Sequence, residues 1–164
     1  MNRSLTRLLF GSSAARTFTQ PSTTQKTRIC AFKNHRKLLS LVLNEGLREL
    51  GWHSCANTRL TMIKLPSTFE KFGPYALEGT RNLTVVLPEN ILSVGSRWSL
   101  IGVGGEKLQM PQQALTIEQN VFRNCTELKE VLFPPDCKMN RICTEAFAKS
   151  GLTAFTAPSG LKEL

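Results

Sequence analysis

The sequence of 164 residues predicts a repeat solenoid, in which one small unit is stacked repeatedly along an axis. Three observations predict it. Prolines recur at near-constant steps of 22 to 24 residues, and each closes a short apolar run such as LTVVLP or KEVLFP. An apolar residue then tends to recur three and six positions further on. The prolines of this series are Pro66, Pro88, Pro111, Pro134 and Pro158.

Each unit opens with a short strand that the proline ends. In the run LKEVLFP, apolar residues alternate in direction as in a β-strand, and Leu132 points away from the others. The strand ends at the proline because proline cannot donate a hydrogen bond to a ladder. A single unit cannot bury its apolar residues without its neighbours. We therefore expect these residues to be buried together: Phe122, Leu128, Val131, Phe133 and Phe147.

The positions three and six after the proline turn the chain inward around a corner. They hold the pairs Leu47 and Leu50 (counted from Asn44, which replaces the proline), Phe69 and Phe72, Ile91 and Val94, Ala114 and Ile117, and Leu161 and Leu164. The fifth unit is longer, with Cys137 and Ile142 in these places. If all units share one axis, Leu60 and Leu83 should be as buried as Leu128.

Two features depart from simple repetition. Asn34, Asn57 and Asn124 share one position, where we expect a buried asparagine that satisfies backbone groups of the turn. Gly102, Gly104 and Gly105 replace a leucine in the fourth unit, where we expect a bulge or a break.

The repeated unit reads AFxNCxxLxxVxLPxxxxxI, as in VFRNCTELKEVLFPPDCKMNRI and EAFAKSGLTAFTAPSGLKEL. It resembles the BspA-type leucine-rich repeat over about residues 29–164, in about six units of 22–24 residues. The resemblance implies a right-handed stack with a short parallel sheet on one face, mostly strand and irregular coil with little helix. It also implies adhesion or protein binding and carries over no catalytic motif.

The positive charge is concentrated near the N-terminus. Eight of the 21 Lys and Arg lie in residues 1–44, which hold no acidic residue, whereas the remaining 120 residues carry 13 basic and 12 acidic groups. A nucleic-acid-binding face spread along the solenoid would be strongly basic throughout. We therefore expect no nucleic-acid partner.

Residues 1–28 form a basic segment with three interpretations. Pro21 lies 23 residues before Asn44, and FGSSAARTFTQPS aligns with FAKSGLTAFTAPS, which indicates a degenerate first repeat. The acid-free, Arg- and Ser-rich composition, with Leu5, Leu8 and Leu9 on one turn, is also typical of a mitochondrial presequence. A disordered basic tail is the third interpretation. No apolar run is long enough for a signal-peptide core or a membrane span, so we expect a soluble chain in the cytoplasm or, with a presequence, in a mitochondrion-like organelle.

The other end of the array reaches Leu164, the sixth position after Pro158, without a polar cap. We expect that the chain is a fragment of a longer array, or that another chain covers this end. End-to-end self-association through the last coil would provide such a cover.

Residues for catalysis or metal binding are few. The cysteines are five in number and form no CxxC pair, and Cys55 and Cys125 fall at or beside core positions, which favours buried thiols. His35 and His53 have no ligand partners at metal spacing. We expect no enzyme activity, no cofactor and no metal.

The sequence therefore predicts a non-catalytic binding scaffold that contacts a protein partner through its exposed strand face. The outward row of that face is Val42, Lys64, Val86, Gln109, Leu132 and Thr156. Half of these residues are aliphatic, and contiguous apolar surface often marks a contact site. The alternatives are an organelle-targeted repeat protein and a fragment of a larger surface adhesin.

Overall fold

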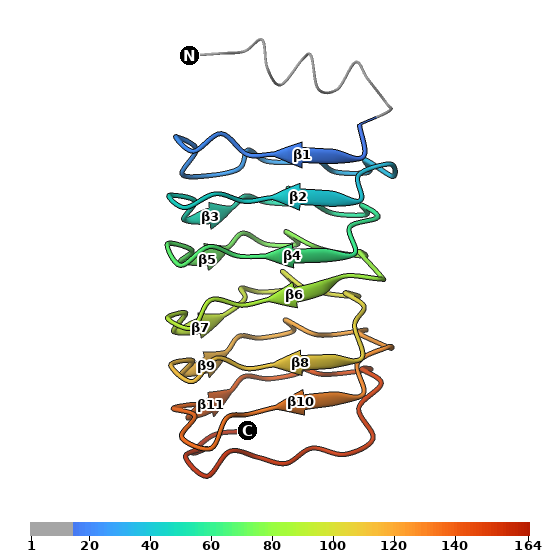
Figure 1. Cartoon of the computed structure of the whole chain (residues 1–164). Coiled ribbons are helices and arrows are strands. Elements are labelled where there is room, and N and C mark those ends of the chain that lie inside the picture. Colours follow the sequence, from blue (N-terminus) through green and yellow to red (C-terminus); the bar gives the residue numbers. More distant parts are fainter. Residues whose placement is uncertain (1–14) are drawn as a thin grey trace.

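The computed structural model describes residues 15–164, which form a parallel β-solenoid. Figure 1 shows the strands stacked one above another along the axis, with the described N-terminal coil at one end and the C-terminus at the other. Each full coil holds a longer strand, a shorter strand and a run of turns that leads to the next coil. No helix occurs within residues 15–164. The predicted repeat solenoid is confirmed.

The longer strands, of three residues each, line one side of the stack. They are β1 (Thr17–Thr19), β2 (Ser40–Val42), β4 (Met62–Lys64), β6 (Thr84–Val86), β8 (Lys107–Gln109) and β10 (Glu130–Leu132). β1, β2, β4 and β6 form one parallel sheet, and β8 and β10 form another. The middle residue of each strand points inward, as alternation requires.

The shorter strands, of two residues each, form a second ladder that the sequence pattern did not predict as sheet. They are β3 (Glu49–Leu50), β5 (Lys71–Phe72), β7 (Ser93–Val94), β9 (Thr116–Ile117) and β11 (Arg141–Ile142). β3 pairs with β5, and β7, β9 and β11 form a three-stranded sheet. The second residue of each strand is the inward residue expected at the corner, from Leu50 to Ile142.

The core runs continuously through the coils. Leu60 and Leu83 are fully buried, as is Leu128 to within a few per cent, so the early units share the axis of the later ones. Phe122 and Val131 are also buried. Phe133 and Phe147 are only half-buried, which corrects part of the expected cluster.

The cause of this partial exposure lies in the last coil. Phe133 contacts the edge of Phe155, at 5.7 Å between ring centroids, and Phe155 is itself exposed. Phe147 stacks on Phe122 at 5.3 Å, and its ring centroid lies 6.0 Å from that of Phe155. Rings packed against an exposed neighbour keep part of their surface in water.

The long-strand ladder is interrupted between β6 and β8, in the glycine-bearing unit where a break was expected. At Gly104 the backbones approach so closely that a Cβ atom would lie 1.3 Å from the Arg81 carbonyl oxygen. The stack itself continues, since the Gly104 amide donates to the Thr80 carbonyl at 3.2 Å. Val103 and Leu100 keep the core filled across the gap.

The shared asparagines are exposed, so the expectation of buried side chains was wrong. Asn34, Asn57 and Asn124 have φ values of 63°, 54° and 59°, in the left-handed region. Asparagine tolerates this region better than other residues with a side chain. The position therefore requires a backbone conformation and not a buried amide, although Asn57 Nδ2 does donate to Asn34 Oδ1 at 3.3 Å.

Part of the basic N-terminal segment belongs to the stack. β1 pairs in parallel with β2, with Thr19 opposite Val42, and Lys26 forms a further bridge with Glu49. The presequence-like turn of Leu5, Leu8 and Leu9 lies outside the described residues.

Candidate partner-binding face

The predicted outward row lies on the solvent side of the long strands. Val42, Lys64, Val86, Gln109 and Leu132 each occupy the third position of a long strand and are exposed. Lys64 pairs with Val86, and Gln109 with Leu132, in the parallel ladders. Thr156 is also exposed, but it does not belong to a strand, because the last coil forms none at this position. The ladder break between β6 and β8 divides the row in two.

The apolar members of the row keep much of their surface in water. Val42, Val86 and Leu132 are 44%, 38% and 37% exposed. The first position of each long strand also points outward, and it adds Met62, which is 58% exposed. Leu39, just before β2, adds another exposed side chain. The sequence analysis did not predict Met62 and Leu39 as exposed. Each is adjacent in sequence to an inward residue, Ile63 and Leu38, and this alternation could have identified them.

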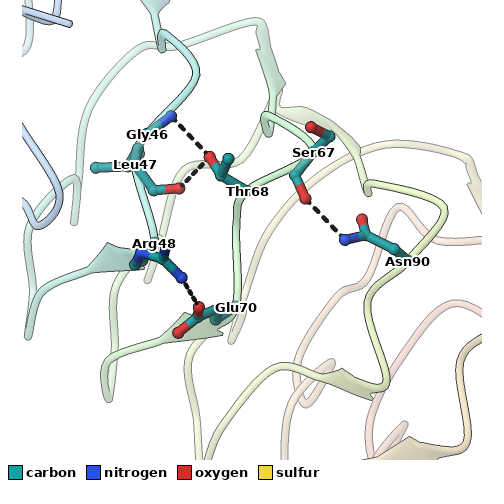
Figure 2. A network of polar contacts seen from close by, with 7 residues as sticks. All are labelled: Gly46, Leu47, Arg48, Ser67, Thr68, Glu70 and Asn90. Atoms are coloured by element: carbon teal, nitrogen blue, oxygen red, sulfur yellow. Dashed lines mark hydrogen bonds and ion pairs between the residues drawn. The ribbon is translucent and has the colours of Figure 1, made fainter.

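The corner between the long and short strands uses its polar groups to join coils. Figure 2 shows the Thr68 hydroxyl accepting from the Gly46 amide at 2.9 Å and donating to the Leu47 carbonyl at 3.0 Å. Asn90 donates from its side-chain amide to the Ser67 carbonyl at 2.8 Å, and Arg48 pairs with Glu70. Because these polar groups already form hydrogen bonds or ion pairs within the chain, the corner has fewer free groups with which to bind another protein.

A stack of rings follows the turns after the short strands, and sequence reasoning missed it too. The centroids of His53 and Tyr75 are 4.9 Å apart, those of Tyr75 and Trp98 are 5.5 Å apart, and both pairs are close to parallel. Trp52 stacks on His53 at 5.3 Å, and the Arg97 guanidinium lies over Trp98. Aromatic residues at steps of 22 and 23 are the signal that could have revealed it.

The stacked rings sit on backbone positions that bulky residues seldom occupy. His53, Tyr75 and Trp98 have φ values of 50°, 55° and 60°. Such conformations cost of order 1 kcal/mol each, which ring stacking of about 0.5–1.5 kcal/mol per pair can offset. The rings cover one another's faces, so this stack is explained by stability between coils.

The repeat geometry agrees with a family model. The model described as "BspA type Leucine rich repeat region (6 copies)" matches residues 3–99 and 84–164. The chain belongs to the BspA-type leucine-rich repeat family. A sequence search of curated proteins found no significant match.

Solved structures share the fold of this BspA-type chain. The pneumococcal vaccine antigen PcpA is 22% identical, with a TM-score of 0.65 over 75% of this chain and 31% of PcpA. A leucine-rich repeat protein from Bacteroides ovatus is 17% identical, with a TM-score of 0.69 over 90% of this chain and 44% of its own. The T. pallidum leucine-rich repeat protein is 19% identical, with a TM-score of 0.60 over 80% of this chain and 70% of its own. The BspA-type chain thus spans less than half of the first two proteins.

The chemical groups of the BspA-type array suit a scaffold. Cys55 and Cys125 are buried as predicted, and burial raises the pKa of each thiol to about 12. Burial and the nearby Glu118 carboxylate also raise the pKa of Cys143. Within residues 15–164, no three His, Cys, Asp or Glu side chains gather as a metal site requires. Nor does this part of the chain contain a helix long and apolar enough to cross a membrane.

Proposed function

We propose that this BspA-type chain is a non-catalytic scaffold that binds a protein partner through the exposed face of its long strands. The observation that carries the proposal is the set of large apolar side chains left in water on that face. Within residues 15–164 they are Leu39, Val42, Met62, Val86 and Leu132. A stable chain has no need of such a set on one face, and exposed apolar patches of this kind often mark protein contacts.

The contrast with the neighbouring corner supports the choice of face. That corner is bonded from coil to coil, as the Gly46, Thr68 and Leu47 contacts illustrate. On the long-strand face, outward side chains such as Val42 and Val86 end in solvent. A partner gains more from burying unused apolar surface than from displacing hydrogen bonds that are already made.

The non-catalytic part of the proposal has its own support. The high thiol pKa of Cys55 and Cys125 leaves almost no thiolate for nucleophilic attack near neutral pH. His53 lies 3.2 Å from Glu78, and its ring is stacked against Trp52 and Tyr75. The organelle-targeted and adhesin-fragment alternatives gain no support from the described residues.

A capture experiment tests the strand face. The triple variant Val42→Ser, Val86→Ser, Leu132→Ser should lose the partner that the wild-type chain retains, because it removes apolar contact area from the centre of the face. The fold should persist, since exposed substitutions usually change stability by no more than about 0.5 kcal/mol each. Circular dichroism and thermal melting verify that persistence.

The matched control is the pair Leu161→Lys, Leu164→Lys in the last coil, where Leu164 is exposed. This pair should retain the partner. If it abolishes association while the strand-face variant binds normally, the contact is end-to-end stacking of coils and the strand-face proposal is wrong.

A further inference from the structure

Cations form a row along the turns that lead into β2, β4 and β6. Arg36, Arg59 and Arg81 each lie two residues after the second left-handed residue of their coil, so they occupy equivalent places in consecutive coils. All three are exposed. Lys37, beside Arg36, and Lys64, in the outward row of β4, are exposed as well.

No acidic residue shares this part of the long-strand face. The segments that build it, residues 33–43, 57–65 and 79–87, contain no Asp or Glu. Glu78, three residues before Arg81 on the same turn, lines a surface hollow with Arg81 but forms no ion pair with it; its Oε2 lies 3.2 Å from His53 Nδ1. Among the ion pairs within residues 15–164, none involves Arg36, Arg59 or Arg81.

The other half of the face is different. Residues 102–110 and 124–132, around β8 and β10, contain Glu106, Glu127 and Glu130. Lys107 pairs with Glu130 across the ladder at 2.9 Å. The positive field therefore ends at the ladder break between β6 and β8, and it does not extend along the solenoid.

The isolated chain leaves this row of charges uncompensated. Neighbouring coils lie about 4.8 Å apart, so like charges in successive coils repel, with only solvent and salt to screen them. A ligand with carboxylates spaced along the axis would relieve that repulsion. Arginine is well suited to this, because its planar guanidinium binds a carboxylate through two hydrogen bonds.

The uncharged part of the surface indicates which polyanion fits. The large apolar side chains exposed between the cations are Leu39, Val42, Met62 and Val86, which are aliphatic or thioether and are interspersed with exposed Thr61 and Thr84. Single-stranded nucleic acids are held by aromatic rings on which the bases stack. The exposed or half-buried Trp52, Tyr75 and Trp98 lie instead on the turns after the short strands. Aliphatic surface flanked by arginines suits a polypeptide that alternates acidic and apolar residues.

We infer that the partner docks an extended acidic segment with interspersed apolar residues on the β2, β4 and β6 part of the face. The carboxylates meet Arg36, Arg59 and Arg81, and the apolar side chains cover Val42, Met62 and Val86. This inference rests on the proposed function and adds the chemistry of the partner to it.

Selection from a phage-displayed library of random peptides tests the inference, since it requires no identified partner. Peptides selected on the wild-type chain should be enriched in Asp and Glu next to apolar residues. Their affinity should fall about tenfold or more in the variant Arg36→Gln, Arg59→Gln, Arg81→Gln, and it should weaken steeply with added salt. The matched control Lys129→Gln, Lys149→Gln, Lys162→Gln removes the same charge from exposed sites elsewhere and should bind within about twofold of wild type.

Four results would overturn the inference. The library yields no binder above an unrelated control protein, the selected peptides have no acidic excess, both variants lose affinity equally, or an oligothymidylate strand binds more tightly than every selected peptide. The last result would identify the surface as a nucleic-acid site.

A third variant separates this inference from the proposed function. Neutral peptides that lose affinity in Val42→Ser, Met62→Ser, Val86→Ser but keep it in the arginine variant would refute the acidic segment and leave the strand face as the binding site. Peptides that keep full affinity for all variants would refute both.

Discussion

The turns of each coil hold two residues in the left-handed backbone conformation, four positions apart. Backbone conformation determines the residue type at the second position, whereas side-chain packing influences it at the first. The second position is Asn or Gly in most coils, the residues that reach this conformation at least cost. The first position holds Cys30, His53, Tyr75 and Trp98 among others. At His53, Tyr75 and Trp98, stacking between coils outweighs the local preference.

The cysteines allow a prediction at the scale of the single residue. Cys30 is exposed, whereas Cys55 and Cys125 are buried with a pKa of about 12. At pH 8 a thiol with that pKa is about one part in ten thousand thiolate. Iodoacetamide should therefore label Cys30 in the native chain and leave Cys55 and Cys125 unlabelled, as mass spectrometry of tryptic peptides would show.

Unfolding in urea is the control for this labelling, because it should make all three thiols reactive. The burial would be contradicted if Cys55 reacted in the native chain as fast as Cys30. Raising the pH increases the thiolate fraction of a buried thiol, but labelling of Cys55 should stay slow until the coils open.

At the scale of the element, the glycines of the fourth unit have unequal roles. Gly104 lies against the Arg81 carbonyl and has no room for a side chain. Gly102 has a φ of 65°, and the nearest atom to an added Cβ is 3.8 Å away. Gly104 permits the close approach of two coils. Gly102 occupies the left-handed position at which other coils have Asn57 and Asn124.

The two glycines should respond differently to substitution. Gly104→Ala should destabilise the chain by about 3 kcal/mol, because backbone and not a flexible side chain stands in the way of the methyl group. Gly102→Asn should lie within about 0.5 kcal/mol of wild type, because asparagine accepts the left-handed conformation and restricts the unfolded chain. Urea denaturation measures both, and equal losses would contradict the assignment of the close approach to Gly104.

At the scale of the whole molecule, the short-strand side and the long-strand side differ in how their charged side chains are used. The short-strand side joins coils through ion pairs, as where Glu49 contacts Lys26 at 2.6 Å and Lys71 at 3.4 Å. On the long-strand side, the part around β2, β4 and β6 keeps Arg36, Arg59 and Arg81 and its apolar side chains in solvent. Because Glu49 links three successive coils, its charge affects the stack as a whole.

The pH dependence of stability should reveal this link. Burial alone would raise the pKa of Glu49, but hydrogen bonding and attraction to Lys26, and attraction to Lys71, outweigh it and lower the pKa below the usual value of 4.5. A lowered carboxyl pKa adds stability above the unfolded-state pKa, and that stability is lost as the pH falls through the folded-state value. Glu49→Gln should therefore cost about 1 kcal/mol near pH 7, and the difference from wild type should vanish in acid.

Thermal melting of both proteins from neutral to acidic pH measures the difference. Glu127→Gln is the control, since Glu127 is exposed and makes no ion pair within residues 15–164. A Glu49→Gln variant that melts with wild type at every pH would show that the three-coil ion pairs contribute nothing to the stack.

Much of the face could be predicted from spacing. The proline series locates the ends of the long strands, and alternation then separates inward Leu41, Ile63 and Val131 from outward Val42, Lys64 and Leu132. Burial of Leu60 and Leu83 and the break at the glycine unit followed from the same register. Spacing suffices here because a solenoid repeats one local structure, so position within the unit decides which side chains are buried.

The sequence by itself thus determined the period, the strand ends, the inward row and the outward row. Only the tertiary structure decided which rows act together. The ladder of short strands and the ring stack of His53, Tyr75 and Trp98 depend on contacts between coils. The row of Arg36, Arg59 and Arg81 depends on the equivalent left-handed turns that lead into β2, β4 and β6. Units differ in length by one or two residues. The place of the extra residues in each turn determines which residues contact one another across coils, and backbone packing determines that place.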